Sequence, residues 1–131
     1  MSVLVRDDGF HAEDFAGVAA ELGPDTPAGV IAERIAGAAL VTVLFPSFAD
    51  GRGFTLGRLV RAAGYTGRLR AKGPLIADQY PLARRSGFDE VEIPAEIAAR
   101  QSEAEWRTEA ARGAPDYRAR LGFKGCDALI A

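Results

Sequence analysis

The residues that decide the fold are Leu40-Val-Thr-Val-Leu-Phe45, a nearly continuous apolar and β-branched run. Such a run is typical of a strand inside a sheet, with both of its faces covered. After a loop that ends near Phe54, apolar side chains recur at helical spacing from Leu56 to Ala63, with Thr55 predicted as the N-cap. A strand, a loop and an amphipathic helix in this order indicate an α/β protein.

The rest of the chain continues this alternation. Further strands are predicted at residues 3–5, 68–72 and 88–93, and helices at 12–22, 27–38, 79–85 and 95–111. Strands that alternate with helices over short connections pair in parallel through right-handed crossovers. We therefore predict one α/β domain over residues 1–131, with a small, mostly parallel sheet and flanking helices. The sheet is either open or part of a β/α barrel, and the chain from about residue 95 is helical or irregular.

The scarce residue types exclude several kinds of site. Cys126 and His11 are the only cysteine and histidine among 131 residues. A structural zinc ion or an iron–sulfur cluster takes four such ligands, so we predict no metal site and no cofactor of that kind. No apolar run approaches the roughly 20 residues that cross a bilayer. The first residues lack the pattern of a secretory signal, so we expect a cytoplasmic protein.

Charge is unevenly distributed along the chain, although the net charge is only −2. Residues 51–88 carry eight bases and one acid, whereas residues 1–50 carry eight acids and two bases, and residues 89–131 carry nine acids and six bases. The basic segment either forms a positive face that attracts an anion or acidic partner, or lies beside the acidic segments and is neutralised by them. No dense basic run with interleaved aromatics indicates nucleic-acid binding.

One string of residues resembles a known bacterial family. The string is Phe45-Pro-Ser-Phe-Ala-Asp-Gly-Arg-Gly-Phe54, supported by similar runs at residues 64–67, 69–71, 78–79 and 85–89. It resembles domain of unknown function 934, and the resemblance covers about residues 3–93. Members of that family are usually labelled probable oxidoreductases of sulfite reduction and tend to be encoded beside assimilatory sulfite reductase. The resemblance implies a place in sulfur assimilation rather than a mechanism. Ser86 stands where members often have cysteine, so no thiol chemistry is implied there.

The loop after the first-quoted strand is the main candidate site. Ligands of open α/β sheets bind beyond the carboxyl ends of the strands, where this loop is expected to lie. Gly51 and Gly53 allow a close backbone approach, and Arg52 offers a guanidinium suited to sulfate, sulfite, phosphate or a carboxylate. The alternative is a tight turn in which Arg52 pairs with Asp50 or Asp78 and has no ligand.

Three more residues are expected at the same edge of the sheet. Lys72 ends a predicted strand and is a candidate contact for an anion. Asp78 either caps the next helix or orients Arg52, and Gln79 either belongs to that helix start or contacts a ligand. With Asp50, Gly51, Arg52 and Gly53, these residues complete the predicted ligand- or partner-binding set. No catalytic residue is assigned.

Three functions remain open. The first is an accessory protein of assimilatory sulfite reduction that binds the reductase, or an acidic electron carrier, through the basic segment. The second is a small oxidoreductase or oxyanion-binding enzyme that uses the loop from Asp50 to Gly53. The third is a homodimer in which Trp106 and the last helix form the interface. Whether the chain catalyses a reaction is not decided by its residues.

Overall fold

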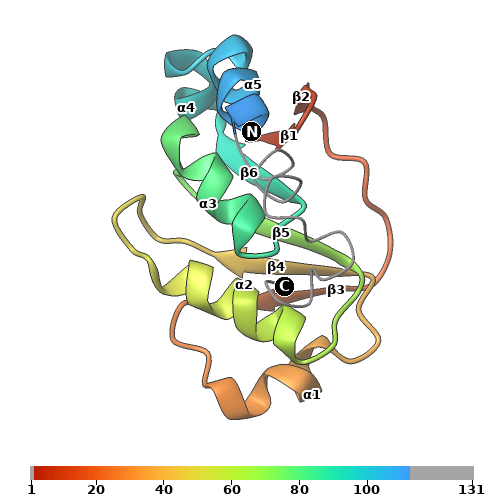
Figure 1. The fold of residues 1–131 in the computed structure, drawn as a ribbon. Coiled ribbons are helices and arrows are strands. Elements are labelled where there is room, and N and C mark those ends of the chain that lie inside the picture. Colours follow the sequence, from red (N-terminus) through yellow and green to blue (C-terminus); the bar gives the residue numbers. More distant parts are fainter. Residues whose placement is uncertain (1, 113–131) are drawn as a thin grey trace, which may run out of the picture.

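Six strands form one open sheet in the computed structural model, which describes residues 2–112 (Figure 1). Their order across the sheet is β2-β1-β6-β5-β4-β3. The strands are β1 (Ser2–Arg6), β2 (Gly9–His11), β3 (Ala19–Leu22), β4 (Leu40–Leu44), β5 (Arg68–Lys72) and β6 (Glu90–Pro94). Strands β3 to β6 are parallel, whereas β1 is antiparallel to both β2 and β6. The prediction of a mostly parallel α/β sheet is confirmed, and the sheet is open rather than a barrel.

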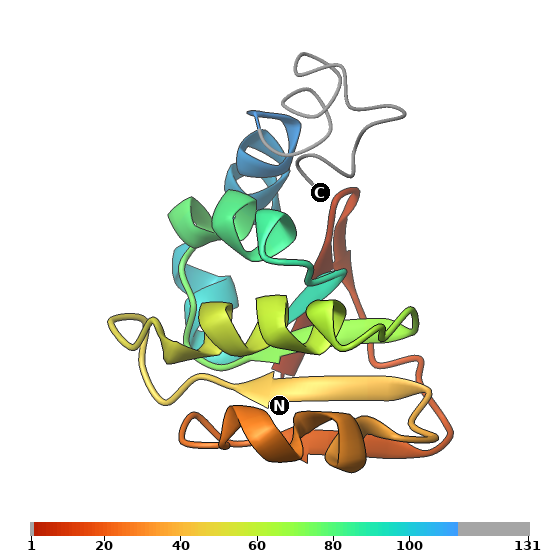
Figure 2. The ribbon, with the colours of Figure 1, turned by 60° about the horizontal axis from the view of Figure 1, so that its bottom comes forward.

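Helices connect the parallel strands and follow the last one. They are η1 (Ala28–Val30), α1 (Ile31–Ile35), α2 (Arg52–Ala62), η2 (Ala77–Gln79), α3 (Tyr80–Arg85), α4 (Ala95–Arg100) and α5 (Glu103–Arg112). Figure 2 shows α1, α2, α3 and α5 following one another along the sheet. Right-handed crossovers that all step in the same direction place their helices on the same face.

The hydrophobic core lies between that face and the helices. Alternate strand residues, among them Val41, Leu69 and Val91, point into one cluster that the helix side chains complete. The residues between them, such as Arg68 and Glu90, lie on the opposite face, which the connecting helices do not cover. The run at residues 40–45 is nevertheless buried on both faces, as predicted, because Leu40 and Thr42 are buried as well as Val41 and Val43.

The segment from residue 12 to residue 22 is not the predicted helix. Residues 12–18, here called the strap, are irregular and connect the edge strand β2 to the opposite edge strand β3. Residues Ala19–Leu22 pair in parallel with Leu40–Val43 as β3. Alanine-rich sequence favours a helix locally, but pairing with a distant strand decided the structure here.

The helix after β4 begins earlier than expected. Its N-cap is Gly51, so Arg52 is already helical and Thr55 is an exposed residue of the first turn rather than the cap. This turn needs glycine at position 53, because a Cβ there would clash with the ring of Phe45. The rings of Phe45 and Phe54 pack 4.9 Å apart across the same contact. Gly53 is therefore required by packing.

The predicted long helix from residue 95 is divided into two. Helix α4 ends at Arg100, and Ser102 begins the next turn by accepting the backbone N–H of Glu105 at 3.4 Å. Helix α5 then packs on α3 and β2, and its Trp106 is fully buried with its ring centroid 6.2 Å from that of Tyr80 in α3. Trp106 therefore packs within the chain and is not an exposed dimer contact. The predicted irregular tail and Cys126 lie outside the described residues.

Candidate functional site

The loop between β4 and α2 lies at the carboxyl edge of the parallel strands, as predicted. Phe45 donates its backbone N–H to the carbonyl of Lys72 at 2.8 Å, which joins this loop to the end of β5. The side-chain amide of Gln79 donates to the carbonyl of Phe48 at 2.7 Å, and its oxygen accepts the N–H of Ile76 at 3.1 Å. Gln79 thus fixes two carboxyl-edge loops to each other.

Asp50 and Arg52 form the predicted turn contact. Asp50 accepts the backbone N–H of Arg52 at 3.1 Å and its guanidinium at 3.0 and 2.7 Å. These hydrogen bonds from Arg52 lower the pKa of the Asp50 carboxyl to about 2, so it is ionised at neutral pH. The guanidinium, 59% exposed, already has a carboxylate partner. Asp50 thus occupies one edge of the guanidinium, and an oxyanion at this loop would have only the remaining N–H groups of Arg52, close to a carboxylate of the same charge.

The other predicted site residues are brought together only in part. Lys72 is exposed at the end of β5, beside a cavity of about 340 Å³ that Ser2, Glu92 and Pro94 also line. Asp78 is exposed in η2 and does not cap the helix, because the N-cap of η2 is Ile76. Arg52 pairs with Asp50 rather than with Asp78. Four of the predicted residues, Asp50 to Gly53, are consecutive. Gln79 contacts the same loop through the carbonyl of Phe48, whereas Asp78 is not the partner of Arg52.

Phe48 is the residue of this edge that the sequence reasoning missed. Its side chain is 57% exposed, and the only other exposed large hydrophobic residue among residues 2–112 is Val18. The carbonyl of Phe48 is held by Gln79, so the ring stands on a fixed part of the loop. One signal was available, because an aromatic residue between Pro46 and Asp50 has no place in the alternation of a strand.

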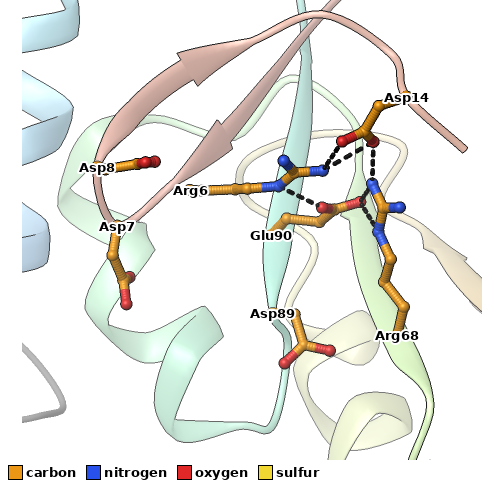
Figure 3. Close-up of a pocket in the computed structure, with 7 residues that line it drawn as sticks. All are labelled: Arg6, Asp7, Asp8, Asp14, Arg68, Asp89 and Glu90. Carbon is orange, nitrogen blue, oxygen red and sulfur yellow. Dashed lines mark hydrogen bonds and ion pairs between the residues drawn. The ribbon is translucent and has the colours of Figure 1, made fainter.

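The sheet face that the connecting helices leave uncovered carries three arginines around one carboxylate, and Figure 3 shows two of these arginines, Arg6 and Arg68, with Glu90. We call Arg6, Arg68, Arg70 and Glu90 the arginine cluster. Glu90 is 1% exposed and accepts the Nε–H of Arg6 at 2.9 Å, of Arg68 at 3.0 Å and of Arg70 at 2.6 Å. Each guanidinium is therefore oriented by the same buried group.

The outer ends of the same guanidiniums meet the strap. Asp14 bridges Arg6 and Arg68, with its carboxylate 2.8 Å from one Nη and 2.6 Å from the other. Glu13 binds Arg70 through both Nη atoms, at 2.7 and 3.0 Å. Figure 3 shows Asp14 on the strap with Glu90 below it and the two arginines on either side. The open cavity beside this contact, about 670 Å³, is lined mainly by acidic side chains.

These contacts support neutralisation by the acidic segments for four of the eight bases in the basic segment. Arg68 and Arg70 pair with acids from before and after the segment. Arg61 likewise pairs with Asp89, and Arg84 with Asp7. Much of the basic segment is thus neutralised inside the fold, whereas Lys72 and Arg52 remain exposed at the carboxyl edge. Within residues 2–112, acidic, cysteine and histidine side chains do not gather into a group that could hold a metal ion, and no helix is long and apolar enough to cross a bilayer.

A family model described as a bacterial protein of unknown function, DUF934, matches residues 19–124. The chain belongs to this family. The matched region starts at β3, later than the resemblance at residues 3–93 indicated, and continues past α5. No curated protein and no solved structure matches the chain.

Within this DUF934 chain, the matched region holds the whole carboxyl-edge loop, together with Arg68, Arg70 and Glu90. Arg6 and the acidic residues of the strap precede it. The carboxyl edge exposes an aromatic side chain, Phe48, and four residues later an arginine, Arg52, and both residue types suit contact with another molecule's surface. The arginine cluster offers three guanidiniums aligned by a buried group, with carboxylates bound to their outer ends.

Proposed function

We propose that this chain is an accessory protein of assimilatory sulfite reduction that binds the reductase, or its acidic electron donor, at the carboxyl edge of the parallel strands. The pathway is taken from the family resemblance described above. The observation that supports a binding role at this edge is that one loop and the helix start that follows it expose both an aromatic side chain, Phe48, and an arginine, Arg52.

The loop has the properties of a protein-contact surface. Aromatic residues and arginine are enriched in protein interfaces, and arginine is also enriched among the residues that dominate their binding energy. The contacts from Gln79 to Phe48 and from Asp50 to Arg52 fix the loop before a partner arrives. A partner therefore does not have to order this loop, which reduces the entropic cost of association.

The alternative function, an oxyanion-binding enzyme, requires Arg52 to accept a small anion. Its guanidinium and its backbone N–H both donate to the ionised carboxylate of Asp50. A sulfite or sulfate ion would find only the remaining N–H groups of the guanidinium and would be repelled by the neighbouring carboxylate. A protein surface can instead pack on the exposed Phe48 ring and leave the Asp50–Arg52 pair intact, so the contact function is favoured.

Binding of the immobilised full-length chain to purified assimilatory sulfite reductase, and to its electron donor, tests this proposal. We expect binding at low salt, with Phe48→Ala weakening it about tenfold or more and Arg52→Ala also weakening it. The matched control is Val18→Ala, which shortens the other exposed large hydrophobic residue and should leave affinity unchanged.

Two results would contradict the proposal. One is no binding to either protein at low salt, where charge attraction is strongest. The other is that the Phe48→Ala variant binds with the same affinity as the control variant Val18→Ala. Calorimetric titration of the chain with sulfite addresses the alternative, and heat of binding that disappears in Arg52→Ala would favour the oxyanion function.

A further inference from the structure

The arginine cluster has an inner side and an outer side that differ in exposure. On the inner side, all three Nε–H groups donate to Glu90, which is 1% exposed. On the outer side, the terminal Nη groups bind Glu13 and Asp14, whose side chains are 54% and 50% exposed. The buried carboxylate holds the guanidiniums in place, while the strap carboxylates reach them from solvent.

This difference makes the contacts of Asp14 exchangeable, since its partners are themselves 26% and 25% exposed, whereas the buried Arg70 would keep Glu90 and Glu92 if Glu13 left. Ion pairs in contact with water contribute little to stability and are weakened by salt, whereas a buried charge cannot lose its partners without a large cost. Loss of Glu13 and Asp14 from the cluster would leave Glu90 binding all three Nε–H groups, so the arginines would keep their arrangement. Arg6, Arg68 and Arg70 would then face only Glu90 and Glu92 among the carboxylates that now contact them.

The strap shows which chemical groups can bind to the outer side of the arginine cluster. Glu13 and Asp14 are adjacent residues of an irregular segment, and they bind three guanidiniums between them. Phe15 follows directly, and the guanidinium of Arg68 lies over its ring, 5.6 Å from the centroid. In an acidic pair followed by an aromatic residue, the carboxylates therefore bind the N–H groups of the guanidiniums, and the ring stacks on the planar face of one of them.

We propose that the strap covers a docking surface for an acidic segment of a partner protein, and that such a segment binds the arginine cluster by replacing Glu13 and Asp14. The partner segment carries two neighbouring carboxylates, with an aromatic residue beside them. This surface lies on the face without helices and is separate from the carboxyl-edge loop, so it does not depend on the function proposed above.

The intramolecular strap competes with any external segment. Its high effective concentration, in the millimolar range for short connections, weakens an external segment of equal intrinsic affinity. Removing the two strap charges should therefore raise the affinity for an acidic peptide without changing the arginines. A partner that binds several surfaces at once would overcome this competition in the native protein.

The test measures binding of a labelled peptide by fluorescence anisotropy to the full-length chain. The peptide repeats residues 11–17, His-Ala-Glu-Asp-Phe-Ala-Gly, which are the last residue of β2 and most of the strap, and the control peptide has Gln-Asn in place of Glu-Asp. The Glu13→Gln/Asp14→Asn variant should bind the acidic peptide at least tenfold more tightly than the unmodified chain does. That affinity should fall as salt is raised, and the control peptide should not bind.

A second substitution locates the binding. Adding Arg68→Gln to the double variant should remove most of the gained affinity, whereas adding Arg58→Gln, an exposed arginine of α2, should not. Equal peptide affinity for the unmodified chain and the double variant would overturn the proposal, as would equal binding of the acidic and control peptides. Circular dichroism shows whether the double variant is folded. If it is not, Asp14→Asn alone must show an intermediate gain, and no gain in that variant overturns the proposal too.

Discussion

Replacing Glu90 with glutamine should lower the free energy of unfolding by about 3–5 kcal/mol, the usual cost of removing one partner from a buried ionic network. Glutamine has nearly the same shape but no charge, and its single amide oxygen cannot replace both carboxylate oxygens, one of which accepts the Nε–H of Arg6 and the other those of Arg68 and Arg70. At least one guanidinium would then face an amide N–H group, and the three arginines, one of them only 4% exposed, would lose the charge that they share. Chemical denaturation at pH 7, followed by far-UV circular dichroism, measures the change.

Glu96→Gln is the matched control, because it makes the same chemical change at an exposed position of α4. We expect it to change stability by no more than about 0.5 kcal/mol. A loss below about 1 kcal/mol in Glu90→Gln would show that the three arginines do not depend on this carboxylate.

Replacing Trp106 with alanine should cost about 3–5 kcal/mol, because a large side chain with no exposed surface would leave a cavity. The packing contacts that are lost should be those of α5 with α3 and β2. Trp106 is the only tryptophan, so its fluorescence reports the docking of α5 in the unmodified chain, and far-UV circular dichroism is needed for the variant.

Trp106→Phe is the informative comparison. Its ring would keep much of the packing against Tyr80, and the substitution removes an indole N–H that is buried without a hydrogen-bond partner among residues 2–112. We therefore expect it to cost less than half as much as the alanine substitution. Equal losses in the two variants would contradict this account of how α5 is held.

The strands that the sequence predicted correctly have local signals. Residues 68–72 were predicted and found as β5, since a short strand flanked by glycine leaves few alternatives. The apolar run of β4 is similarly explicit. Strand β3 carries no such signal, because Ala19-Ala-Glu-Leu22 has neither β-branched nor aromatic residues. It forms through pairing with β4, about twenty residues later, which a local pattern does not contain.

In the candidate site, too, contacts between residues close in the sequence were predictable, whereas contacts between distant residues were not. The Asp50–Arg52 contact spans two residues and was among the predicted alternatives. The arginine cluster joins residues as far apart as Arg6 and Glu90, which are 84 positions from each other. One trace of it was present, since bases occur at every second position of residues 68–72 and acids at residues 90 and 92. That spacing places opposite charges on one face only if the two strands are neighbours, and neighbour relations come from the fold.

The pKa of the Glu90 carboxyl, followed by NMR titration of the full-length chain, tests most directly whether the three arginines converge on it. Burial alone would raise this pKa, and the hydrogen bonds from Arg68, Arg70 and Arg6 outweigh that effect, so we predict a value below the ordinary 4.5 of glutamate. A lowered pKa stabilises the fold above the unfolded-state value, and that contribution is lost as pH falls through the folded-state value. A Glu90 pKa above 4.5 in the folded chain would contradict the arginine cluster.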